Sequence, residues 1–217
     1  MVWAFHVGSQ LGSETGIVRQ PNCREGTHEI AAILVSQRNP AMITTQQHLS
    51  EMQRYVAKVG MTPSALRNLG AKGFVKAAID FLSSVNLAPL VGVNPSTYPR
   101  WLDAQTNALM AAFPIKLWGP ARKAMNIFMV MASLNIFLRD AYGLGRFDDV
   151  LEVPLDNIVE GELRKFGLAQ KLFPTGFPQW DSIKNLDPPN SAKYQQIAQA
   201  MASQRGIPRG RLDVALF

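Results

Sequence analysis

The longest apolar stretch of the chain covers residues 124–138, where only Asn126, Ser133 and Asn135 are polar. A helix with this pattern is apolar almost all round, so we expect it to lie at the centre of the fold. The stretch is shorter than the ~20 residues that a helix needs to cross a bilayer. We therefore predict a buried core helix that stops around residues 142–143, and no membrane partner.

Apolar residues recur at helical spacing in several other segments, and glycine or proline residues separate these segments. No segment alternates between apolar and polar residues over more than four positions, so no strand is predicted. The sequence thus predicts an all-α protein with roughly ten helices. Besides the core helix, the predicted helices cover residues 27–39, 44–59, 62–69, 74–84, 100–113, 157–166, 191–204 and 209–217.

Three segments have no helical pattern. Residues 1–26 are rich in Gly, Ser and Gln and are predicted to form an N-terminal arm. Residues 86–99 and 167–190 are rich in proline, which predicts a loop and an irregular covering segment. With 217 residues and 47% hydrophobic residues, the chain is expected to form a single globular unit, as one domain or two closely packed lobes.

Charge and cysteine content narrow the classes of function. Twenty-two Lys and Arg residues against 16 Asp and Glu residues give a net charge of +6, which is expected of a protein that binds a polyanion. The single Cys23 excludes an internal disulfide and a four-cysteine metal site. His28 and His48 have no second ligand at helical spacing, so we expect no metal and no cofactor. The N-terminus has no signal-peptide pattern, and we expect a cytoplasmic protein.

The start of the core helix carries the most suggestive lysine. Trp118, Gly119 and Pro120 favour a turn before the helix, which predicts Lys123 in its first helical turn. Burial and the positive end of the helix dipole both disfavour an ammonium charge there, which makes a lysine a candidate nucleophile. The alternative is that Arg122 and Lys123 are only a solvated cap of the helix.

Four stretches share their order and spacing with a known family: ILVSQ (33–37), SALRNLG (64–70), WGPARK (118–123) and VPLD (153–156). Taken together, the chain resembles the helix-hairpin-helix DNA glycosylases of the endonuclease III superfamily, most closely their archaeal 8-oxoguanine glycosylase branch. The resemblance covers residues 28–217. It implies a two-lobed fold in which about 40–142 form one lobe and 27–39 with 143–217 form the other, with the active site in the cleft between them.

The resemblance also implies roles for individual residues. Lys123 and Asp156 take the catalytic positions, and Gln37 is placed to fill the gap that an extruded base leaves. The implied DNA contacts also include Lys72, Lys76, Lys116, Trp118, Gly119 and Arg122, and the implied walls of the base pocket are Trp118 and Trp180. Lys116 is an alternative to Lys123 as the lysine that faces the cleft. The sequence W-G-P-A departs from the Gly-x-Gly hairpin of the family, and the iron–sulfur cysteines of some members are absent.

The implied function is that of a monomeric DNA glycosylase, which flips a damaged or modified base out of double-stranded DNA and cleaves its N-glycosidic bond, with or without lyase activity. An oxidised purine and a bulky modified cytosine, as in phage DNA, are the two substrate classes we expect, in repair or phage defence at the nucleoid. Two alternatives stay open from the residues. One is a non-catalytic DNA-binding module of the same fold, and the other is a helical protein-interaction domain with incidental basic charge.

Overall fold

The predicted core helix is broken into two helices in the computed structural model of the chain. These are α5 (Trp118–Leu134) and α6 (Ile136–Tyr142), and their axes differ by 94°. Asn135 makes the break, because its side chain accepts a hydrogen bond from the backbone N–H of Leu138 at 3.1 Å and so caps α6. The helix also starts earlier than predicted. Pro120 fits into the first turn of α5, where backbone N–H groups have no partner within the helix.

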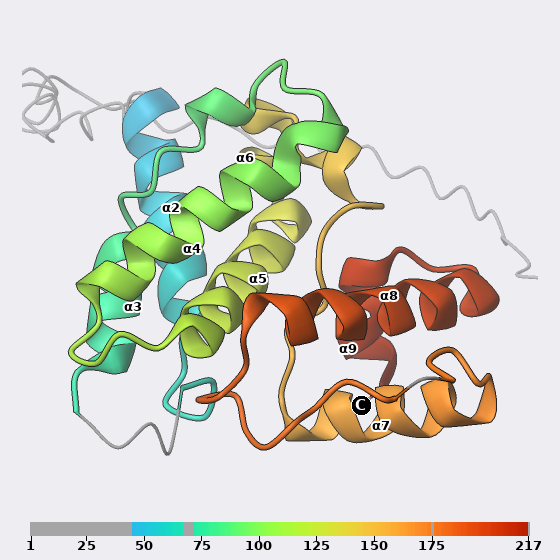
Figure 1. Ribbon diagram of the computed structural model, residues 1–217. Coiled ribbons are helices and arrows are strands. Elements are labelled where there is room, and N and C mark those ends of the chain that lie inside the picture. Colours follow the sequence, from blue (N-terminus) through green and yellow to red (C-terminus); the bar gives the residue numbers. More distant parts are fainter. Residues whose placement is uncertain (1–44, 67–71, 175, 217) are drawn as a thin grey trace, which may run out of the picture. The chain divides into compact units, whose positions relative to one another are not determined.

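The structure describes residues 45–66, 72–174 and 176–216, which all belong to one compact unit spanning residues 43–217. These residues form helices, turns and loops without any strand, which confirms the all-α prediction (Figure 1). The other α-helices are α2 (Thr45–Gly60), α3 (Phe74–Leu82), α4 (Tyr98–Ala112), α7 (Asn157–Ala169), α8 (Pro188–Arg205) and α9 (Leu212–Leu216). Short 3-10 helices are η1 (Ala88–Leu90), η2 (Pro95–Thr97), η3 (Leu144–Phe147) and η4 (Arg209–Arg211).

The buried apolar side chains form two clusters along the chain. The first runs from Val56 to Leu151 and surrounds α5, which packs against α2, α3, α4 and α6 (Figure 1). The second runs from Val153 to Leu212 and is built by α7, α8 and the end of the chain. Ile183, in the segment before α8, packs against both clusters. The change from one cluster to the other falls at Glu152.

Several predicted helices have different limits in the structure. Residues 63–66 form turns where a helix over 62–69 was expected, and residues 67–71 lie outside the described part. The proline-rich segment 86–99 holds η1 and η2, because a proline in the first turn of a short helix needs no N–H partner. Helix α8 begins three residues before the predicted start, capped by Asp187, whose carboxylate accepts from the Asn190 N–H at 2.8 Å. The predicted arm and the helix over 27–39 lie outside the described residues.

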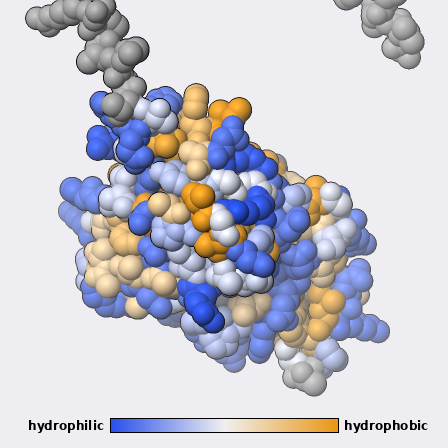
Figure 2. All heavy atoms as spheres, turned by 90° about the horizontal axis from the view of Figure 1, so that it is seen from above, coloured by the Kyte–Doolittle hydropathy of each residue, from blue (hydrophilic) through white to orange (hydrophobic). Residues whose placement is uncertain are grey.

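No single helix in the described part of the chain is long and apolar enough to cross a bilayer. Helices α5 and α6 together have the length and composition for such a span, but they are sharply bent at Asn135. On the face shown in Figure 2, polar side chains predominate and apolar side chains form small, separate patches.

Candidate active site

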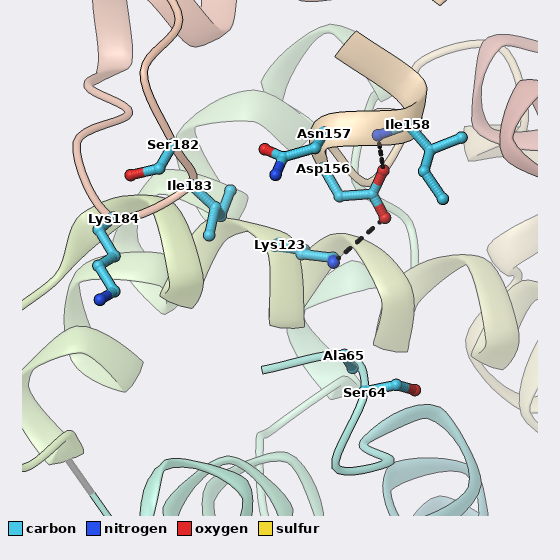
Figure 3. Close-up of a pocket in the computed structure, with 9 residues that line it drawn as sticks. All are labelled: Ser64, Ala65, Lys123, Asp156, Asn157, Ile158, Ser182, Ile183 and Lys184. Atoms are coloured by element: carbon cyan, nitrogen blue, oxygen red, sulfur yellow. Dashed lines mark hydrogen bonds and ion pairs between the residues drawn. The ribbon is translucent and has the colours of Figure 1, made fainter. Parts of the chain in front are cut away.

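The structure brings Lys123 and Asp156 together, although they are far apart in the sequence. The Nζ atom of Lys123 lies 3.3 Å from the Oδ2 atom of Asp156, as Figure 3 shows. The lysine side chain is 10% exposed and the aspartate side chain 31%, so the ion pair is largely shielded from solvent. Lys123 comes from the second turn of α5, one turn later than predicted, because the helix starts at Trp118.

The two carboxylate oxygens of Asp156 have different partners. Oδ1 accepts hydrogen bonds from the backbone N–H groups of Ile158, at 2.9 Å, and Val159, at 3.0 Å. Asp156 is therefore the N-cap of α7, as the sequence predicted, and the start of the helix stabilises its negative charge. The cap fixes the orientation of the carboxylate and leaves Oδ2 for Lys123.

Two adjoining cavities share the Lys123–Asp156 pair. Both also contact Ser64 and Ala65, in the turn after α2. The first cavity has a volume of about 180 Å³, and its other lining residues are Asn157, Ile158, Ser182, Ile183 and Lys184 (Figure 3). The second has a volume of about 340 Å³ and is completed by Gly60, Thr62, Ile127, Pro154 and Asp213. The second volume falls within the ~300–1,000 Å³ typical of small-molecule sites.

Asp213 is a charged site residue that the sequence did not reveal. It lies in the short helix α9 and contributes a second carboxylate to the larger cavity. Burial and the nearby charge of Asp156 raise the pKa of Asp213 above its usual range, and Lys123 opposes that shift. The one signal in the sequence was an isolated acid among the apolar residues of the C-terminal segment, which does not show what the acid faces.

The raised pKa of Asp213 predicts how stability responds to pH. Because the folded chain holds this proton more tightly than the unfolded chain, ionisation of Asp213 makes unfolding more favourable as the pH rises above 3.8, the ordinary value for the group. We expect Asp213→Asn to raise the melting temperature at neutral pH and the difference to vanish below that value. Thermal unfolding of both chains across a pH series measures it. A variant less stable than the wild type at neutral pH would contradict the prediction.

Arg122 does not occupy the position expected of a DNA contact. Its side chain is 7% exposed, and its Nε and Nη2 atoms donate to Glu152 at 2.8 and 2.7 Å. Nη1 donates to Asp103 at 2.7 Å. Burial opposes the guanidinium charge, but the two carboxylates outweigh it and raise the pKa of Arg122. The prediction that Arg122 contacts DNA therefore does not fit its place in the interior.

Gly119 and Trp118 also face the interior. A Cβ atom on Gly119 would lie 2.0 Å from the carbonyl oxygen of Ile183, so glycine is required for the close approach of that segment to α5. Trp118 is half-buried against the second cluster, and the guanidinium of Arg122 lies 5.5 Å from the centre of its ring. Neither residue is among those that line the two cavities.

Trp180 lies beside the first cavity without lining it. Its indole N–H donates to the side-chain oxygen of Asn157 at 3.1 Å, and Asn157 is a lining residue. The ring packs edge-on against Tyr194 with centroids 5.5 Å apart. Trp180 thus supports the cavity wall through Asn157 and does not itself line either cavity.

The other predicted lysines lie outside the cavities. Lys116 donates to the carbonyl oxygens of Phe113, at 3.1 Å, and Ala111, so Lys123 and not Lys116 pairs with Asp156. Lys76 is exposed and paired with Asp80, and Lys72 is exposed in the turn before α3. Gln37 lies outside the described residues.

Gly119→Ala is expected to destabilise the chain and displace the segment that lines the first cavity. The added methyl group meets backbone atoms of Ile183, which cannot rotate away, so we expect an overpacking cost of about 1–3 kcal/mol in the free energy of unfolding. Gly161→Ala is the matched control, because a Cβ atom on this glycine of α7 meets nothing within 4 Å. It should stabilise the chain by roughly 0.5–1 kcal/mol. Urea unfolding measures the change in the free energy of unfolding for both variants. Equal changes in the two variants would contradict the prediction.

Comparison with known proteins gives no relative from which to transfer a function. No family model matches the chain, no curated protein matches it, and no solved structure matches it. In the part of the chain that the structure describes, no group of three or more His, Cys, Asp or Glu side chains is placed to hold a metal ion. The function must therefore be inferred from the geometry of the site itself.

Proposed function

We propose that the chain is a DNA glycosylase that extrudes a damaged or modified base and cleaves its N-glycosidic bond. The observation that carries the proposal is the 3.3 Å pairing of Lys123 with Asp156 at the junction of two cavities. Cleavage of the bond builds positive charge on the sugar, and a fixed carboxylate beside the anomeric carbon stabilises that charge. Asp156 is such a fixed carboxylate, because the start of α7 holds one of its oxygens and leaves the other beside the cavities.

Two nucleophiles are compatible with this pair. A water molecule can be oriented by Asp156, which leaves an abasic site, or the neutral amine of Lys123 can attack the sugar and form a Schiff base. In both cases the base must first leave the DNA stack, at a cost of a few kcal/mol that protein contacts must offset. The adjoining cavities offer space for a base on one side of the pair and for the sugar beside it.

The two hydrophobic clusters support the proposed two-lobed helix-hairpin-helix arrangement. Lys123 belongs to a helix of the first cluster, and Asp156 starts a helix of the second. A site at such a junction receives one catalytic group from each side. The larger cavity is compatible with an oxidised purine and with an enlarged cytosine, the two substrate classes that we propose.

The basic charge supports double-stranded DNA as the partner. The net charge is +6, and the exposed Lys184 lies at the first cavity beside Ser182 (Figure 3). Lysines that neutralise phosphates release counterions, so the affinity for duplex DNA should fall steeply as the salt concentration rises. A protein-interaction domain with incidental charge would show no such dependence.

The proposed function is tested with oligonucleotide duplexes that each carry one damaged or hypermodified base. Duplexes with oxidised purines and with enlarged cytosines are incubated with the chain, and strand breaks are measured with and without alkali treatment. Breaks that need alkali indicate hydrolysis to an abasic site, and breaks without alkali indicate lyase chemistry. Salt-dependent binding without release of any base would favour the non-catalytic DNA-binding module.

A further inference from the structure

Asp213 brings a second carboxylate to the cavity that holds Lys123 and Asp156. It is half-buried in α9, on a different element from either partner. The charged groups of the described residues that act on it are Asp156, at the start of α7, and Lys123, from α5. The turn after α2 contributes Thr62 and Ser64 to the same cavity, and neither carries a charge.

The site therefore combines one amine with two acids. Asp156 uses one oxygen to cap α7 and offers the other at 3.3 Å, which is longer than the ~2.7–2.9 Å of a strong charge-assisted hydrogen bond. A second carboxylate at the same cavity, that of Asp213, adds to the attraction for an ammonium ion.

We propose that Asp213 is a positioning residue that keeps Lys123 as an ammonium ion and so directs the site to attack by water instead of attack by the amine. The inference rests on the proposed function and decides between its two nucleophiles. An ammonium nitrogen has no lone pair with which to form a bond to the sugar. It is, however, a proton donor for the departing base.

The resulting reaction is balanced without a co-reactant other than water. Water adds to the anomeric carbon and gives one proton to Asp156, while the bond between that carbon and the base nitrogen breaks. The base leaves with the bonding electron pair and takes a proton from Lys123. The proton on Asp156 then passes to the amine 3.3 Å away, which restores the ammonium ion and the carboxylate.

The charge state of Lys123 is measured without DNA. The chain is treated with formaldehyde and cyanoborohydride, which methylate only neutral amines, and the rate at Lys123 is followed by peptide mass spectrometry between pH 6 and pH 9. Removing one nearby carboxylate should increase the neutral fraction, so we expect Asp213→Asn to react on the order of tenfold faster near neutral pH. Asp213→Glu keeps the charge and should react at the wild-type rate.

Two further variants keep the test decisive. Asp213→Ser also removes the charge, and it replaces the asparagine variant if that chain does not fold. Glu162→Gln removes an acid that is paired with Lys165 on α7, and it should leave the rate at Lys123 unchanged. Equal methylation of Lys123 in the wild type and in folded, uncharged variants of Asp213 would overturn the proposal.

A second experiment separates this inference from the proposed function. Each protein variant is incubated with duplex DNA that contains an abasic site, in the presence of borohydride. Borohydride reduces a Schiff base on Lys123 and so traps the DNA on the protein. We expect little trapping by the wild type and several-fold more by Asp213→Asn. Faster methylation without trapping by any variant, together with no base release, supports the charge assignment and overturns the glycosylase assignment. Base release with strong wild-type trapping overturns the role of Asp213 and leaves the glycosylase assignment in place.

Discussion

Lys123→Gln and Asp156→Asn are each expected to lower the rate of base release by about 10²- to 10⁴-fold, the range for loss of a positioned acid–base group. Both residues lie at the junction of the two cavities, with their charged atoms 3.3 Å apart. Asparagine is as good an N-cap as aspartate, so Asp156→Asn should keep α7 in place while it removes the carboxylate charge. The rate is measured under single-turnover conditions on whichever duplex of the panel the wild type cleaves.

Two matched variants control for indirect effects. Asp187 caps α8 as Asp156 caps α7, yet it is not among the residues that line the cavities. Asp187→Asn should therefore keep full activity. Lys165→Gln removes an exposed lysine of α7 and should likewise keep it. Duplex binding should remain close to the wild-type affinity in all four variants. Unchanged base release in Lys123→Gln or Asp156→Asn would show that the chemistry lies elsewhere.

Loss of one partner in the buried ion network should be the most destabilising single change outside the site. Glu152 accepts two hydrogen bonds from Arg122 and a third from Asn126 at 3.0 Å, and it stands where one hydrophobic cluster gives way to the other. Among the residues that the structure describes, Glu152→Ala leaves the buried guanidinium of Arg122 with only Asp103 as a charged partner. We expect a loss of about 3–5 kcal/mol in the free energy of unfolding, as for other broken buried ion pairs.

Urea unfolding measures this loss of stability, and two further variants serve as references for its size. Arg122→Met combined with Glu152→Met replaces both charges by apolar side chains, and it should be less destabilising than Glu152→Ala alone. Glu162→Ala breaks an exposed ion pair on α7 and should change stability by less than about 1 kcal/mol. If Glu152→Ala were no more destabilising than Glu162→Ala, the network would contribute little to the fold.

Local patterns in the sequence were sufficient to predict much of the helical fold. The limits of α2 and α4 lie within a few residues of those predicted, since glycine and proline residues mark their ends. The cap role of Asp156 was predictable for the same reason, because an aspartate before a helical pattern satisfies N–H groups close by in the chain. The pairing of Lys123 with Asp156 was predictable only through the resemblance, because no local pattern links residues in different helices.

Other features depend on contacts that local patterns do not contain. The break at Asn135 was missed because an asparagine inside an apolar stretch is compatible with a polar core position as well as with a cap. Arg122 was expected at the surface, and its burial depends on carboxylates 19 and 30 positions away. Asp213 was missed because the cavity it faces is formed by α5, the start of α7 and the turn after α2.

The claim that Lys123 and Asp156 act on one sugar has a direct test that does not require the excised base to be known. Duplex DNA is prepared with a pyrrolidine in place of one sugar, so that a positive charge stands at the anomeric position, and with an uncharged tetrahydrofuran at the same place. If Asp156 stabilises a cationic sugar, the wild type should bind the pyrrolidine duplex at least about a hundredfold more tightly, as expected of a transition-state mimic. Asp156→Asn should abolish most of that preference. Equal affinity of the wild-type chain for the two duplexes would contradict the account.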